Sequence, residues 1–365
     1  MPKERSEIIL AFRAFTRLLQ NENEVFRMSD KTQKSLSIAE EFSYKIRLEK
    51  RKSRISKIVP VIVLAVLVLF FGLINVEFLS ITNVLTILKQ LSIPLILALG
   101  LTFVIIIGSI DLSVEGVMAL TGCLASIIIM NNKTAVDTGF FGILIVVLVG
   151  ALTGMVTGLI HVKAKLPSFM VSFGISSIAS GFALLCYRGI PATIKHPIFI
   201  SLNKDAFLGI PLITWIAAFV FIVAYILQEY SAFGRYIYAI GDNESIPAQT
   251  GIRVKRIKVL VFVWSGFCIG IAGVIALARS GRGDLLIGKG NLFDAITAVV
   301  LGGTVLSGGK GGVFNTLLGA VIVTVIQNGL ILMDVNPYIQ AGIQGIIIVS
   351  AVALSVSRRK KLIVK

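Results

Sequence analysis

The sequence predicts an all-α integral membrane protein with about ten transmembrane helices and with both termini in the cytoplasm. The 365 residues are 56% hydrophobic and have a mean hydropathy of +0.91, which is far more apolar surface than one soluble core could bury. The apolar residues also fall into blocks close to the roughly 20 residues that a transmembrane helix needs. Basic residues concentrate in alternate loops, and this asymmetry sets the orientation.

Ten apolar blocks account for the predicted helices, and they begin behind a long charged segment. No signal peptide is expected, because the first block starts only at Ile58. The eighth block is the shortest. The predicted spans are residues 58–75, 84–107, 114–130, 140–162, 168–187, 212–229, 257–278, 294–306, 313–333 and 338–356.

With the N-terminus in the cytoplasm, most of the 35 Lys and Arg residues fall on the cytoplasmic side. This distribution follows the positive-inside rule, and an even number of spans returns the C-terminus to the same side. The topology explains the net charge of +16, so no nucleic-acid partner is expected. The opposite side receives only Lys133, Arg188, Lys195, Lys204, Arg279, Arg282 and Lys289, with Lys89 inside or beside the second span.

The chain divides into a leader at residues 1–57, a transmembrane domain at 58–356 and a basic cytoplasmic tail at 357–365. The leader combines basic and spaced apolar residues, a composition that suits an amphipathic helix on the inner membrane surface. A partly disordered basic tail has a similar composition. Both interpretations of the leader stay open.

The turn between the second and third spans contains Asp111, Ser113 and Glu115. Counting spans from a cytoplasmic N-terminus places this turn on the cytoplasmic side. Asp111 or Ser113 is expected to cap the following helix, and ion coordination by Asp111 is the alternative. Acidic residues are nearly absent deeper within the predicted spans. The energy for any transport is therefore expected to come from outside this chain.

Glycine recurs at helical spacing in two predicted spans. Gly150, Gly154 and Gly158 line one face of the fourth span, and Gly266 and Gly270 do the same in the seventh. Small residues at this spacing allow membrane helices to approach closely. Both stripes are therefore predicted to be packing seams between helices.

The fifth span carries a stripe of serines with aromatic neighbours: Ser168, Ser172 and Ser176, with Phe169 and Phe173. Hydroxyls and aromatic faces suit a polyhydroxylated solute, so these five residues are candidates for a translocation pathway. Serines also serve as small packing residues in membrane helices. Both uses stay open at this point.

Six glycines occur in residues 301–312, between the eighth and ninth spans. A phosphate-binding loop would need Gly at position 304 and Ser or Thr at position 311. This chain instead has Thr304 and Gly311 at those positions. The segment is therefore interpreted as a tight turn rather than a nucleotide site. Its turn residues are Gly302, Gly303, Gly308 and Gly309.

No enzyme can be assembled from the remaining side chains. The two histidines, His161 and His196, fall on opposite sides of the membrane by parity and have no catalytic or metal-ligating neighbours in the sequence. The three cysteines lie within or at the end of apolar spans and share no metal-like spacing, so buried free thiols are expected. We therefore expect no catalytic residue, no metal site and no cofactor in this chain.

Three separated motifs resemble, in their order, those of the ribose-type sugar permeases. These proteins are membrane subunits of bacterial ABC importers in the branched-chain amino acid/ribose permease superfamily. The motifs are Gly108–Ser113, Ala232–Asn243 and Ala298–Gly311. The resemblance covers about residues 78–353.

The resemblance implies an ABC importer permease bundle in the bacterial cytoplasmic membrane, surrounded by lipid. Its implied partners are an ABC ATPase subunit that binds ATP and Mg²⁺, an extracytoplasmic sugar-binding protein, and a second permease copy, identical or a paralogue. The implied function is import of a pentose- or hexose-type monosaccharide. The sequence does not select one sugar.

The connection at residues 231–258 is the longest predicted cytoplasmic loop between spans, and its section 242–251 is expected to form a short helix ended by glycine. In the family this region is the ATPase-coupling segment. The resemblance carries that role to Gly241, Asn243, Ala248, Gly251 and Ile252. An ordinary basic loop is the alternative, and Ile246-Pro247 departs from the family's usual pair of alanines.

Two other functions stay open. A branched-chain amino-acid or nucleoside permease of the same superfamily would carry similar glycine-rich turns, although the stretch Leu306–Gly311 favours the sugar branch. A secondary carrier or channel would work without ATPase partners. Co-purification of an ATPase separates this last class from the ABC permeases.

Overall fold

The computed structural model describes residues 59–133, 138–187, 189, 191–204 and 206–355, which form a bundle of helices with one short hairpin. The predicted leader at 1–57 and tail at 357–365 lie outside the described residues. The all-α membrane fold is confirmed. A helix occupies each of the ten predicted span ranges.

Within the described residues, seven helices are long: α3 (Ile81–Ile106), α5 (Gly139–Ala164), α6 (Ser168–Tyr187), α8 (Leu212–Glu229), α11 (Val254–Ser280), α13 (Val313–Leu332) and α14 (Pro337–Ser355). The shorter elements are the helix Val59–Ile74, η1 (Val76–Leu79), α4 (Val114–Ile128), α7 (Pro197–Lys204), α9 (Ala232–Asp242), α10 (Ser245–Gln249) and α12 (Asn291–Leu301), with the hairpin β1 (Ala206–Phe207) and β2 (Ile210–Pro211). Four of these elements were not predicted from the sequence: η1, α7, the hairpin, and α9, which lies in the segment predicted to be a loop.

Six helices of the described residues, α3, α5, α6, α8, α11 and α13, are long and apolar enough to cross a membrane. The predicted eighth span at 294–306 is wrong in its extent, because α12 covers Asn291–Leu301. At about 1.5 Å per residue, this helix is roughly half the ~30 Å hydrocarbon thickness. It ends where Gly303 adopts a left-handed φ of 83°.

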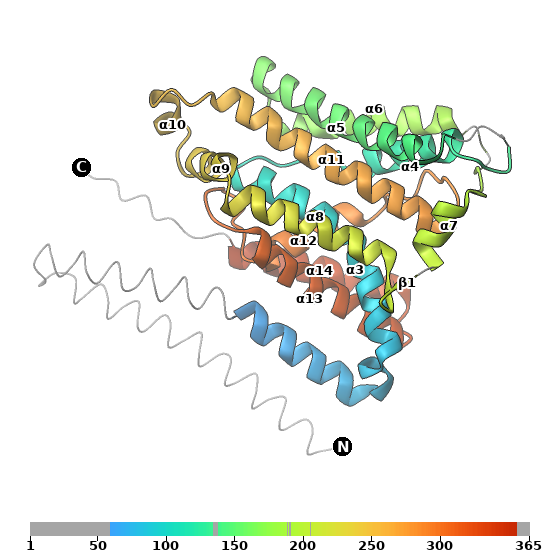
Figure 1. Ribbon diagram of the computed structural model, residues 1–365. Coiled ribbons are helices and arrows are strands. Elements are labelled where there is room, and N and C mark those ends of the chain that lie inside the picture. Colours follow the sequence, from blue (N-terminus) through green and yellow to red (C-terminus); the bar gives the residue numbers. More distant parts are fainter. Residues whose placement is uncertain (1–58, 134–137, 188, 190, 205, 356–365) are drawn as a thin grey trace, which may run out of the picture. The chain divides into compact units, whose positions relative to one another are not determined.

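Helices α3 and α11 form the centre of the bundle (Figure 1). Helix α3 packs against α8, α11, α12 and α13, while α11 packs against α3, α4 and α5. The second half of α3, from Leu91 to Ile106, is buried all round, as expected for a helix that is apolar on every face. Helix α9 also contacts both members of this central pair, whereas α6 packs against α4 and α5.

The two glycine stripes form one seam, which confirms the packing prediction. A Cβ on Gly154 would overlap the carbonyl oxygen of Phe262, and one on Gly266 would overlap that of Gly150. Gly270 lies against the backbone of Val147. Helices α5 and α11 therefore touch backbone to backbone over residues 147–158 of α5 and 259–270 of α11.

Candidate functional site

The three sequence motifs meet at one point, at the ends of α3 and α9 and in the turn between α12 and α13. The backbone N–H of Gly309 donates to the carbonyl oxygen of Ile106 at 2.8 Å. A Cβ on Gly241 would overlap that same oxygen and lie 2.6 Å from the Gly309 nitrogen, and one on Gly308 would lie 2.9 Å from the Gly108 nitrogen. We call Ile106, Gly108, Gly241, Gly308 and Gly309 the glycine junction.

The turn at 302–312 supplies the backbone shape that the junction needs. Gly303, Gly308 and Gly309 have φ values of 83°, 84° and 75°, in the left-handed region that glycine enters without strain. Within the turn, Val305 N–H donates to Lys310 O at 3.0 Å. A Cβ on Gly302 would overlap the backbone of Asn315, at the start of α13. The predicted turn residues thus serve both a sharp reversal and close backbone contact.

Two side chains that sequence reasoning missed tie α8 and α9 to the same turn. The Gln228 Oε1 atom accepts from the backbone N–H of Val313 at 2.6 Å, and Gln228 is 6% exposed. The Tyr238 hydroxyl donates to Gly311 O at 2.7 Å. Burial raises the pKa of Tyr238 to about 12, so the phenol remains a donor at neutral pH. Gln228 could have been identified from the sequence, because it is a lone glutamine at the end of an apolar helix.

The predicted short helix in 242–251 is α10, Ser245–Gln249, and glycine does end it. Asn243 Oδ1 accepts from the Ser245 N–H at 3.1 Å. At the other end, Gly251 N–H donates to Ala248 O at 3.4 Å and Ile252 N–H donates to Pro247 O at 3.1 Å, while Gly251 has a φ of 82°. This is a Schellman ending.

Three of the predicted coupling residues, Ala248, Gly251 and Ile252, therefore shape the end of α10. Pro247 is the third residue of that helix, within the first turn, where a missing N–H leaves no intrahelical bond unmade. The departure from the family pattern is structurally tolerated. The coupling role itself stays a prediction.

Asp111 is buried between α3, α4 and α11, with 1% exposure. Its Oδ1 atom accepts from the N–H and the hydroxyl of Ser113, at 2.9 and 2.6 Å, and its Oδ2 atom accepts from the hydroxyl of Ser265 at 2.8 Å. The Ser113 side chain makes no capping bond to α4, so the predicted serine cap is wrong. Asp111 instead fastens the non-helical turn to α11.

Replacement of Asp111 by Ala should destabilise the protein by at least about 1–3 kcal/mol, because the N–H and hydroxyl of Ser113 and the hydroxyl of Ser265 all lose their acceptor. The measurement is thermal unfolding of the purified protein in detergent. Ser265→Ala, which removes only one of the three bonds, is the matched comparison and should cost less. Equal stability of Asp111→Ala and the parent would contradict this account of the turn.

The serine stripe of α6 bonds to the backbone of the same turn and of α4. Ser168 Oγ accepts from Ile110 N–H at 2.9 Å, Ser172 Oγ from Leu112 N–H at 2.9 Å, and Ser176 Oγ from Gly116 N–H at 3.2 Å. These contacts favour the packing interpretation of the serines. The two aromatic neighbours, Phe169 and Phe173, are 49% and 65% exposed. A pathway role for the five residues remains a prediction.

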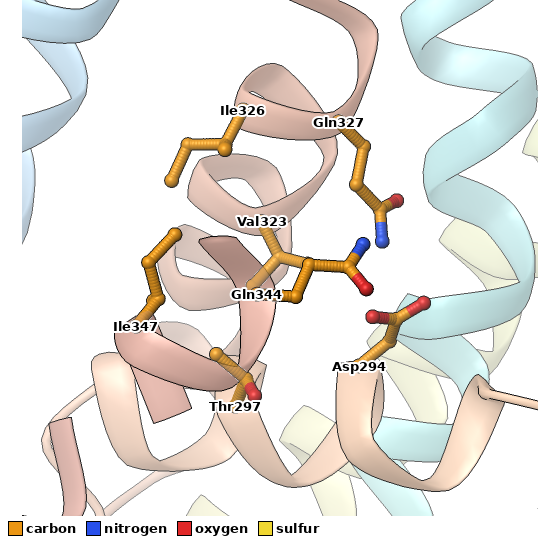
Figure 2. Close-up of a pocket in the computed structure, with 7 residues that line it drawn as sticks. All are labelled: Asp294, Thr297, Val323, Ile326, Gln327, Gln344 and Ile347. Atoms are coloured by element: carbon orange, nitrogen blue, oxygen red, sulfur yellow. The ribbon is translucent and has the colours of Figure 1, made fainter. Parts of the chain in front are cut away.

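A polar cluster between α12, α13 and α14 was also missed. Figure 2 shows the amide groups of Gln327 and Gln344 turned toward the carboxylate of Asp294. The cavity that they line has a volume of about 10 Å³, enough for roughly one water molecule. The signal was present in the sequence, because an ionisable residue in an apolar helix marks a candidate site.

Comparison with known proteins places the chain in a family. Residues 83–352 match the family described as branched-chain amino acid transport system / permease component. The ribose import permease protein RbsC of Haemophilus influenzae is 38% identical over 296 residues, covering 80% of this chain and 90% of the relative. RbsC of Escherichia coli is 35% identical over 302 residues, covering 80% and 91%.

A third relative, the D-allose transport system permease protein AlsC of Escherichia coli, is 32% identical over 293 residues, covering 80% of this chain and 89% of the relative. No solved structure matches the chain. The fold and these matches define a multi-pass integral membrane permease. The chain belongs to the branched-chain amino acid transport system permease component family, and its relatives confirm the resemblance to ribose-type permeases.

Proposed function

We propose that the chain is the permease subunit of an ATP-driven ABC importer and translocates a monosaccharide delivered by an extracytoplasmic binding protein. The observation that carries the proposal is the glycine junction. It joins α9, next to the proposed coupling helix α10, to the central helix α3 through backbone contacts. A displacement of α10 and α9 therefore moves the core of the bundle instead of being absorbed by flexible side chains.

The proposed mechanism is alternating access. ATP and Mg²⁺ bind to separate ATPase subunits, whose closure moves α10, and two permease copies rock between outward and inward openings. In this arrangement the chain crosses the bacterial cytoplasmic membrane ten times, and both termini, α10 and the 302–312 turn face the cytoplasm. The short helices α4 and α12 then cross together with the non-helical residues that flank them, because each helix alone is shorter than the hydrocarbon thickness.

A monosaccharide is the favoured class of substrate because the relatives named above are import proteins for ribose and D-allose. The family description also includes branched-chain amino-acid permeases, and the sugar names of the similar relatives speak against that alternative. The predicted pathway residues Ser168, Phe169, Ser172, Phe173 and Ser176 remain candidates for contact with the sugar.

The test of the proposed function is purification from the native membrane followed by uptake assays. An ABC ATPase subunit should co-purify with the chain, and ATP-dependent uptake of radiolabelled D-ribose or D-allose should require the binding protein. Uptake that instead collapses when the ion gradient is dissipated, with no ATPase attached, would show that the chain is a secondary carrier.

Gly251→Val should uncouple the transporter. A β-branched residue at a φ of 82° costs about 1–2 kcal/mol or more, which opens the end of α10. Uptake and ATPase stimulation should fall at least about tenfold while membrane insertion persists. Gly251→Asn, which tolerates the left-handed region, should retain most activity.

The control for this substitution is Thr250→Val. Thr250 precedes Gly251 and has an ordinary φ of −85°, so valine there causes no backbone strain and removes only the hydrogen bond from the Thr250 hydroxyl to Pro247 O. Normal uptake by Gly251→Val would count against a coupling role for this helix ending.

A further inference from the structure

A cleft lies at the end of the bundle where α10 meets the first turns of α11 and the turn between α5 and α6. It has two adjoining hollows of about 310 and 460 Å³. Both are lined by His161, Pro167, Glu244 and Lys258. The first also touches the turn at 107–110, so we call it the turn-side hollow, and the second touches Lys165 and Lys255.

The charges of the turn-side hollow balance. Its titratable lining consists of His161, Glu244 and Lys258, and the last two form a salt bridge of 2.6 Å. The Nδ1 atom of His161 lies 2.7 Å from the Leu166 carbonyl oxygen, which makes Nδ1 the protonated nitrogen and leaves Nε2 for another partner. Such a lining suits a neutral polyhydroxylated solute better than an anion, because the hollow carries no excess charge.

The size and the apolar wall of the hollow fit a small sugar. A volume of 310 Å³ is at the lower end of the roughly 300–1,000 Å³ typical of small-molecule sites. Phe169, 49% exposed, offers its ring as an apolar surface for the C–H face of a sugar. Phe173, one helical turn further along α6, does not line the hollow.

The salt bridge connects the hollow to α10. Glu244 occupies the N-cap position of α10, and Lys258 lies in the second turn of α11. The turn at 107–110 forms another wall, and its Gly108 belongs to the glycine junction. A movement of α10 relative to α11 therefore changes the Glu244–Lys258 distance and the opening of the hollow together.

We propose that the turn-side hollow is the release site for the sugar, and that the Glu244–Lys258 ion pair is a latch that limits the width of the hollow. This inference rests on the proposed function. Displacement of α10 separates the pair, frees the Glu244 carboxylate and the Lys258 ammonium to bond with sugar hydroxyls, and widens the hollow toward the cytoplasm.

Cysteine labelling in inverted membrane vesicles that carry the complete transporter tests the release site. A membrane-impermeant thiol reagent added to the exposed cytoplasmic face should label Phe169→Cys, and D-ribose, D-allose or L-arabinose should slow the labelling several-fold. Phe314→Cys, in the first turn of α13, is the matched control, because Phe314 is an aromatic residue of similar exposure, 56%, that does not line the hollow, and its labelling should not respond to sugar. The parent protein gives the background from its three native cysteines.

Variants of the ion pair test the latch in the same vesicles. Glu244→Gln should speed the labelling of Phe169→Cys several-fold, and the exchange Glu244→Lys with Lys258→Glu should restore the original rate. Labelling of Phe314→Cys should be the same in each of these variants and in the parent. A general loosening of the fold would instead accelerate both positions equally, and that result would overturn the latch.

Failure of this inference is distinct from failure of the proposed function. If cells carrying the parent import a monosaccharide with ATP but none of the sugars slows labelling of Phe169→Cys, the release site is wrong and the importer assignment stands. If the parent imports no monosaccharide, both are wrong.

Discussion

Gly241→Ala is expected to abolish uptake and to destabilise the permease by at least about 3 kcal/mol. The added methyl group would occupy the position of the Ile106 carbonyl oxygen and lie 2.6 Å from the Gly309 nitrogen. Both obstacles are backbone atoms, and the hydrogen bond between them holds the junction together. Overpacking that displaces backbone is among the more costly core substitutions, beyond the usual ~1–3 kcal/mol.

The measurements for Gly241→Ala are the thermal unfolding midpoint in detergent and ATP-dependent uptake in proteoliposomes. The control is Gly174→Ala in α6, because no atom lies within 4 Å of the position where its methyl group would go. That variant should be as stable as the parent. A stable and active Gly241→Ala protein would mean that the three motifs are not in the contact described here.

Gly154→Leu is expected to have the second large effect, through the seam between α5 and α11. Even a Cβ at this position would overlap the Phe262 carbonyl oxygen, and a leucine would force the two helices apart along the whole seam. The close packing at Gly150 and Gly266 is lost as well, because their backbones touch across the same interface. We expect little folded protein to survive extraction from the membrane.

Val156→Leu is the matched control for the seam. Val156 lies on the same helix two residues away, and its side chain is 41% exposed, so it also gains volume but toward the outside of the bundle. It should be extracted and unfold like the parent. The comparison uses size-exclusion profiles of the two variants before and after heating. Similar profiles for both would show that α5 and α11 do not need their close approach.

The parts of the fold that could be predicted from the sequence were those that depend on the residue pattern of a single helix. Glycine at every fourth residue marks a packing seam whatever the partner is, so Gly150, Gly154 and Gly266 were identified from the chain alone. That the two stripes face each other depends on how helices more than a hundred residues apart pack. The sequence of either helix does not contain that information.

In the candidate site, too, single residues could be predicted from the sequence, but the contacts between distant segments could not. Gly241, Gly308 and Gly309 were each selected from motifs, but their meeting with Ile106 is a property of three backbones and of no single pattern. The serines of α6 had two possible uses, and only the positions of the Ile110 and Leu112 amides favour packing. Helix α12 ended early because local turn geometry at Gly303 outweighed the apolar run that continues beyond it.

The bonds between α6 and the turn before α4 have a consequence for how the chain enters the membrane. Three backbone N–H groups, of Ile110, Leu112 and Gly116, find their acceptors only on serines about sixty residues later in the chain. Until α6 is synthesised, only water at the cytoplasmic face can accept from these groups, and burying an N–H group without an acceptor costs several kcal/mol, so the turn before α4 cannot be buried earlier. Helix α4 is thus expected to stay at the membrane surface or within the translocation machinery and to settle into the bilayer together with α6, as one late unit of biogenesis.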